Sequence, residues 1–159
     1  MSRSTILCGS PKRGSGSLKF AQELFEEKIE EDPNREVTLV SLNDMDICGC
    51  CGCDKCKTSY KCVVDDDMVE VLDIVKQSDE IIVVTPIYMA GVPSQLKAAL
   101  DRFQPMFWEG CRHNSLKPAF LYLFGNGNDP YGDSGAILTL KSALHVAGFE
   151  VKDVKTKIN

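Results

Sequence analysis

Residues 9–17 read Gly9-Ser10-Pro11-Lys12-Arg13-Gly14-Ser15-Gly16-Ser17 and decide how the start of the chain folds. The residues just before this stretch, 5–8, are mostly apolar, and such a run is long enough for one buried strand. After the stretch, apolar side chains recur at helical spacing, with glutamates on the opposite side, at Leu18, Ala21, Leu24, Phe25 and Ile29. The sequence therefore predicts a strand, a turn rich in glycine and serine, and a helix that begins where the turn ends.

This turn has the composition of an anion-binding site. The backbone N–H groups of a first helical turn have no partners within the helix, and the helix dipole adds partial positive charge there. Negative groups bind at such helix starts. The residues that we expect to contact an anion are Ser10, Lys12, Arg13, Ser15, Gly16 and Ser17. Their spacing matches neither the P-loop nor the dinucleotide motif G-x-G-x-x-G, and an ordinary capped turn is the alternative interpretation.

Extended and helical patterns alternate along the rest of the chain, with no internal repeat and no linker. Further strands are predicted at residues 36–42, 80–86, 119–124 and 149–154. This alternation predicts an α/β fold with right-handed crossovers. At this length we expect a single domain over residues 1–159, a flavodoxin-like three-layer sandwich with a five-stranded parallel sheet in the order 2-1-3-4-5.

In that strand order three loops meet where strands 1, 3 and 4 end. The second loop carries Tyr88 and Met89, which suit a flat ring, and Gly91, which permits close approach. The third loop contains Gly125 and Asn126 and is rich in glycine, so it offers backbone donors and acceptors. We therefore expect one site for a ligand with a phosphate at one end and a flat ring at the other. The three loops are residues 10–17, 86–92 and 125–133.

Six of the eight cysteines lie in a loop over residues 47–65. Four of them follow the spacing Cys50-x2-Cys53-x2-Cys56-x5-Cys62. Closely spaced thiolates of this kind resemble the ligands of a [4Fe-4S] cluster more than those of a zinc ribbon, in which two pairs lie far apart. Soft thiolates bind iron–sulfur clusters and zinc alike, so zinc, a disulfide and a metal-free group of thiols stay open as alternatives.

The charge and hydropathy of the sequence argue against two classes of partner, nucleic acids and membranes. The net charge is −5 and the basic residues form no long stripe, so we expect no nucleic-acid partner. The apolar runs are too short to span a bilayer, and no signal peptide is visible, so we expect a cytoplasmic protein with no membrane partner.

Three groups of residues, in this order, carry a family resemblance: Gly9-Ser10-Pro11-Lys12-Arg13-Gly14; Cys50-x-Gly52-Cys53-x-x-Cys56 with Cys62-Val63-x-Asp65-Asp66-Asp67-Met68; and Thr85-Pro86-Ile87-Tyr88 with Leu96-Lys97 and Asp101-Arg102. The chain resembles the NAD(P)H-dependent FMN reductase and iron–sulfur flavoprotein family of flavodoxin-like proteins. The similarity extends over most of the chain and is weakest after Arg102.

The resemblance implies FMN as the cofactor and NAD(P)H as the electron donor. It implies that the FMN phosphate lies on Ser10, Arg13, Ser15, Gly16 and Ser17, and the isoalloxazine ring along Pro86, Ile87, Tyr88 and Met89. It also implies a homodimer or homotetramer in which a neighbouring subunit closes the flavin site.

We therefore expect an FMN-binding oxidoreductase that passes electrons from NAD(P)H to a small-molecule or protein acceptor, through a [4Fe-4S] cluster if the cysteine loop holds one. No side chain is predicted to be catalytic, because the flavin carries the chemistry. The alternative is a non-catalytic redox sensor or scaffold that uses zinc or thiols.

Two charged motifs are predicted to be structural. The acidic residues 65–67 are expected to cap the helix that follows them. Asp101 and Arg102 lie at a helix end and are expected to form an ion pair rather than a catalytic pair.

Overall fold

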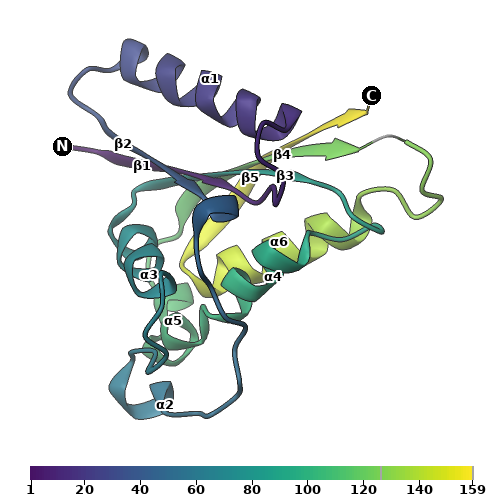
Figure 1. Cartoon of the computed structure of the whole chain (residues 1–159). Coiled ribbons are helices and arrows are strands. Elements are labelled where there is room, and N and C mark those ends of the chain that lie inside the picture. Colours follow the sequence, from purple (N-terminus) through teal and green to yellow (C-terminus); the bar gives the residue numbers. More distant parts are fainter. Residues whose placement is uncertain (126, 159) are drawn as a thin grey trace.

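The structure is a computed structural model that describes residues 1–125 and 127–158, and these residues form a three-layer α/β sandwich (Figure 1). In chain order the elements are β1 (Arg3–Cys8), α1 (Gly16–Glu31), β2 (Glu36–Ser41), η1 (Leu42–Asp44), α2 (Cys56–Ser59), α3 (Met68–Gln77), β3 (Glu80–Pro86), α4 (Ser94–Asp101), α5 (Gln104–Glu109), η2 (Cys111–His113), β4 (Lys117–Gly125), α6 (Ser134–Val146) and β5 (Phe149–Ile158).

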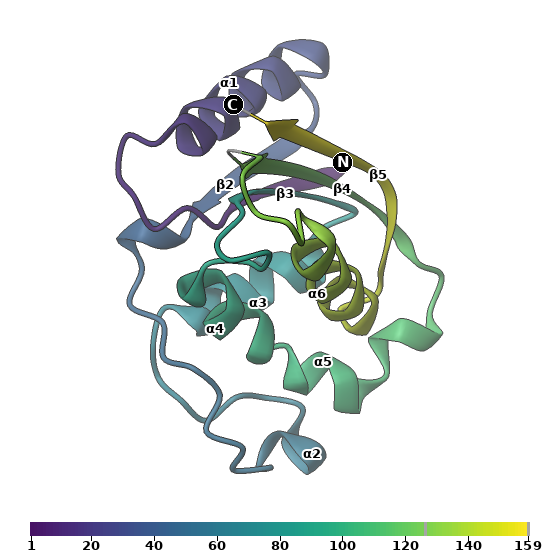
Figure 2. The ribbon, with the colours of Figure 1, turned by 90° about the vertical axis from the view of Figure 1, so that its right-hand side faces the viewer.

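The strands of the described residues form one five-stranded sheet in the order β2-β1-β3-β4-β5, and every neighbouring pair is parallel. The predicted fold class and strand order are therefore confirmed. Helix α1 covers one face of the sheet, and α3, α4, α5 and α6 lie on the other face (Figures 1 and 2). Helices on both faces are what parallel crossovers require.

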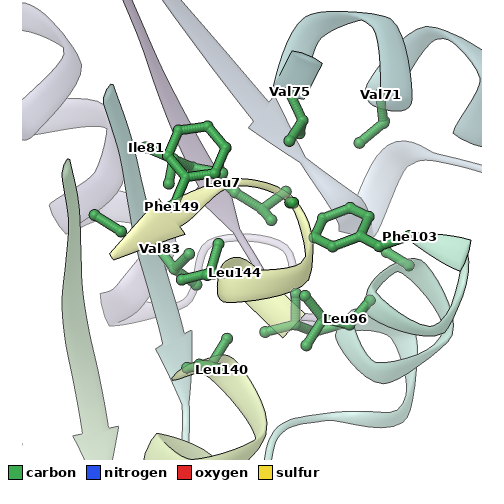
Figure 3. Close-up of a cluster of buried hydrophobic side chains, with 14 of the residues drawn as sticks. Leu7, Val71, Val75, Ile81, Val83, Leu96, Phe103, Leu140, Leu144 and Phe149 are labelled. Carbon is green, nitrogen blue, oxygen red and sulfur yellow. The ribbon is translucent and has the colours of Figure 1, made fainter. Parts of the chain in front are cut away.

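The central strand β3 is buried on both faces, which explains its unbroken run of β-branched residues. Ile82 and Val84 pack in the cluster beneath α1, whereas Ile81 and Val83 face the larger core on the opposite side. Figure 3 shows this larger core, in which apolar side chains of helices α3, α4 and α6 pack against those of the sheet. Its labelled members are Leu7, Val71, Val75, Ile81, Val83, Leu96, Phe103, Leu140, Leu144 and Phe149.

The last two strands are longer than the sequence pattern predicts. Strand β5 continues beyond residue 154 through Lys155, Thr156, Lys157 and Ile158, in which lysines alternate with β-branched residues. Pairing with β4 runs to the end of this stretch, and Lys155 and Lys157 lie over aromatic rings on the face that α1 covers. The Lys157 ammonium is 3.9 Å from the ring centre of Phe20. Such cation–π contacts stabilise the end of this edge strand.

Candidate functional site

A pocket of about 660 Å³ lies where β1, β3 and β4 end, and all three predicted loops contribute to it. Of the predicted site residues, Asn126 lies outside the described part of the chain, and Arg13 and Gly91 do not line the pocket. The lining residues are Ser10, Lys12, Ser15, Gly16, Ser17, Pro86, Ile87, Tyr88, Met89, Phe124, Gly125, Gly127, Asn128, Asp129, Pro130 and Gly132.

One end of the pocket is a cluster of hydroxyl groups at the start of α1. Ser15 is the N-cap of this helix, and its side chain accepts a hydrogen bond of 3.1 Å from the backbone N–H of Leu18. The Ser15 hydroxyl also lies 2.8 Å from that of Ser10 and 3.2 Å from that of Ser17. The N–H groups of Gly16 and Ser17 belong to the first turn, where a helix supplies no acceptor. Hydroxyl and N–H donors thus converge at the positive end of the helix dipole.

The two basic residues of the first loop have different surroundings. Lys12 lines the pocket. Arg13 does not line it and forms an ion pair of 3.1 Å with Asp44 in η1, with 82% of its side chain exposed. The structure therefore places one of the two predicted cations beside the hydroxyl cluster and the other outside it.

Two further lining residues of the pocket, Tyr88 and Met89, belong to a tight turn over residues 88–91. The backbones of Tyr88 and Gly91 exchange two hydrogen bonds of 2.9 Å, and Met89 and Ala90 between them have φ values of 48° and 57°. Positive φ at both central residues is the geometry of a type I′ turn. It costs about 1–3 kcal/mol for each residue that is not glycine, so the surroundings must hold the turn in place.

The support for this turn comes from the start of α6. The backbone N–H of Ala136 donates a hydrogen bond of 2.8 Å to the Ala90 carbonyl. A Cβ atom on Gly135 would lie 2.5 Å from that same carbonyl oxygen, so only glycine permits this approach. The sequence interpretation missed Gly135, although a glycine in the first turn of a predicted helix is a signal of close contact.

The cysteine loop surrounds a second, separate cavity of about 260 Å³. The four predicted ligands Cys50, Cys53, Cys56 and Cys62 all line it, together with Cys51. All are free thiols, and no three of the side chains that the structure describes converge closely enough to form a metal site. The topology thus brings the predicted ligands to one cavity without their reaching ligand geometry.

The thiols of this loop differ in their electrostatic surroundings. Burial raises the pKa of the Cys56 thiol, and the neighbouring thiols of the loop raise it further. The pKa of Cys53 is lowered, chiefly by a hydrogen bond from the backbone N–H of Lys55. Cys53 is therefore the thiol of this pair that is more readily ionised.

The predicted ion pair between Asp101 and Arg102 is wrong. Asp101 pairs with Lys97 at 2.6 Å on the helix surface, whereas Arg102 forms a buried pair with Asp66 at 2.8 Å. Consecutive residues of a helix do not face each other, but residues four apart do. The hydrogen bonds that Arg102 donates to Asp66 are the main reason that the pKa of Asp66 is lowered, and the same bonds raise the pKa of Arg102.

Of the acidic residues expected to cap α3, the N-cap residue Asp67 makes no capping bond with its side chain, and the contact with the helix comes from Asp66. Asp66 accepts a hydrogen bond of 3.1 Å from the backbone N–H of Met68, as a capping residue would. Its other partners are Arg102 and the backbone N–H of Cys48, and Asp67 accepts from the backbone N–H of Asp46. These carboxylates therefore join α3 to the base of the cysteine loop.

A family model described as NADPH-dependent FMN reductase matches residues 3–151. The chain belongs to this family. Membership in the NADPH-dependent FMN reductase family confirms the resemblance inferred from the three motifs.

Among curated relatives, an iron–sulfur flavoprotein of Methanocaldococcus jannaschii is 35% identical over 100 residues, which are 63% of this chain and 51% of that protein. An iron–sulfur flavoprotein of Methanosarcina thermophila is 29% identical over 147 residues, 92% of this chain and 75% of the relative. A solved FMN-dependent NADH-azoreductase of Bacillus anthracis, in complex with FMN, superposes with a TM-score of 0.65 at 18% identity, covering 98% of this chain and 86% of that one. This last similarity shows the fold alone.

In the described residues, no helix combines the length and the apolar character that crossing a membrane requires.

Proposed function

We propose that the pocket binds FMN and that the protein is an oxidoreductase that passes electrons from NAD(P)H to an acceptor. The observation that carries the proposal is the hydroxyl and N–H cluster at the start of α1, in the same pocket as the strained turn of residues 88–91. The family description and the FMN complex of the azoreductase support the choice of FMN over other phosphorylated ligands.

Bound FMN supplies the redox chemistry, because its ring accepts hydride and releases electrons. The chain supplies binding and position. Hydroxyl groups of Ser10, Ser15 and Ser17, with the N–H groups that begin α1, would hold the phosphate, and Lys12 adds a positive charge nearby. Tyr88 and Met89 would lie along the ring, and backbone groups near Gly125 would provide hydrogen bonds. No acidic or basic side chain needs to transfer a proton.

A comparison of FMN with riboflavin tests this assignment. Riboflavin has the same ring but no phosphate, so we expect FMN to bind at least about 100-fold more tightly, as measured by quenching of flavin fluorescence. Equal affinities for the two flavins would contradict the phosphate assignment. A chain that binds neither flavin would contradict the proposal as a whole.

For the cysteine loop, we propose a [4Fe-4S] cluster held by Cys50, Cys53, Cys56 and Cys62. Their spacing, their position around one cavity and the names of the archaeal relatives support this. Cys56 is the first residue of α2, and Cys53 lies three residues before it in the loop that leads into this helix. Soft thiolate ligands fit the group.

Iron analysis after anaerobic reconstitution tests the cluster. We expect about four iron atoms per chain in the parent and about three or fewer in Cys53→Ser, because each ligand holds one iron. Cys111→Ser is the matched control, since Cys111 lies in η2 and does not line the cavity, and its iron content should equal the parent's. A parent that binds zinc but no iron would favour the non-catalytic sensor instead.

We further propose a small-molecule or protein electron acceptor and a homodimer or homotetramer. Two large side chains near the flavin pocket support the oligomer: Met89 is 93% exposed and Tyr131 is 77% exposed. Exposed apolar groups beside a binding site are typical of a surface that another subunit covers.

A further inference from the structure

Arg102 is the most completely hydrogen-bonded side chain around the cysteine loop. It follows the last turn of α4 and is only 1% exposed. A guanidinium group has five N–H donors, and here all five have acceptors between residues 48 and 66. Nε donates to the Cys62 sulfur at 3.2 Å. Nη1 donates to the Cys48 carbonyl and to Asp66 Oδ2, both at 2.8 Å. Nη2 donates to the Val64 carbonyl at 3.3 Å and to Asp66 Oδ1 at 2.9 Å.

The Asp66 carboxylate completes this arrangement. Besides the two bonds from Arg102, it accepts bonds of 2.9 Å from the Cys48 N–H and 3.1 Å from the Met68 N–H. Both ends of the cysteine loop are therefore joined at one buried ion pair, and one member of that pair also contacts a thiol of the cavity wall. A bidentate pair of this kind fixes geometry as well as charge.

We propose that Arg102 is the positioning residue of the cysteine loop: it holds the Cys62 sulfur at the wall of the cavity and raises the reduction potential of the cluster bound there. This inference rests on the proposed function of the loop as a cluster site. No other basic side chain lines this cavity among the residues that the structure describes.

The physical basis is the charge of the reduced cluster. Hydrogen bonds to the sulfur ligands and nearby positive charge stabilise the added electron, so they raise the potential. The Asp66 carboxylate offsets the cation and lowers the potential. Removal of Arg102 and removal of the Asp66 charge should therefore shift the potential in opposite directions, whereas a merely loosened loop would not produce opposite shifts.

The test is an anaerobic redox titration of the full chain, reconstituted with ferrous iron and sulfide. Arg102→Gln should have a more negative cluster potential than the parent, and Asp66→Asn a more positive one. Asp101→Asn is the matched control, because its ion pair with Lys97 is half exposed and does not contact the loop, and its potential should not change. Shifts of the same sign, or no shift, would overturn the inference. If Arg102→Gln does not fold, Asp66→Asn alone tests the inference. A cluster potential in Asp66→Asn equal to or more negative than that of the parent would overturn it.

A second measurement needs no cluster. Amide hydrogen exchange of the metal-free chain should be faster in Arg102→Gln than in the parent by about tenfold or more for residues 47–66, and unchanged in the central strands. Equal exchange in residues 47–66 would show that Arg102 does not hold the loop. A parent that takes up no iron would contradict the proposed cluster, while this exchange measurement would still decide the role of Arg102.

Discussion

A Ser15→Asp variant should bind FMN at least about 100-fold more weakly than the parent, whereas Ser15→Asn should lose less than about tenfold. Asp, Asn and Ser are all good N-cap residues, so either substitution leaves the start of α1 capped. Only aspartate adds a negative charge within a cluster whose hydroxyl groups lie 2.8–3.2 Å apart. At about 4 Å and an effective dielectric constant of about 20, the repulsion between the introduced carboxylate and the FMN phosphate costs about 4 kcal/mol. This is more than the roughly 2.8 kcal/mol that corresponds to a 100-fold loss of affinity.

The measurement is a fluorescence titration with FMN and with riboflavin. The Ser15→Asp substitution should weaken riboflavin binding much less than FMN binding, because riboflavin has no phosphate to repel. Thermal unfolding of both variants should stay close to that of the parent. A Ser15→Asp chain that keeps the parent's affinity for FMN would place the phosphate elsewhere.

An Asp66→Ala substitution should lower the free energy of unfolding by about 3–5 kcal/mol, because it leaves the buried Arg102 charge without its partner. The matched substitution Asp101→Ala removes one member of an ion pair whose side chains are both about half exposed. Its cost should stay below about 1 kcal/mol. Urea unfolding of the two variants measures both values, and equal costs would show that the buried pair contributes no more than the surface one.

The same ion pair predicts how stability depends on pH. Because the pKa of Asp66 is lowered in the folded chain, its contribution is fully present above the unfolded value of about 3.9. That contribution is lost as the pH falls from there through the lower folded pKa. Asp66→Ala should therefore flatten the acid limb of the stability curve, whereas Asp101→Ala should leave it nearly unchanged.

Much of the fold follows from local patterns. The run of β-branched residues in β3 needs no distant partner to be identified as a central strand, and the same holds for the turn that caps α1 at Ser15. The length of the edge strand β5 is different, because its pairing with β4 and the contacts of its lysines with aromatic rings carry it on to Ile158. Its predicted end at residue 154 was therefore too early.

In the candidate site, too, some features could be predicted from the sequence and others depend on contacts between distant segments. The loops that line the pocket lie at strand ends, so parallel topology brings them together once the strand order is known. The side-chain directions within those loops depend on neighbours far away in the chain. Arg13 turns toward Asp44, outside the pocket, and the turn of residues 88–91 depends on Gly135.

By itself, the sequence determined the order of strands and helices, the turn that begins α1 and the grouping of cysteines, because the period and composition of short segments carry that information. Only the tertiary structure decided that Arg102 pairs with Asp66, 36 residues away, rather than with its neighbour Asp101. The reason is geometric: the backbone sends adjacent helical side chains in different directions, and burial leaves a guanidinium stable only where acceptors from another segment surround it.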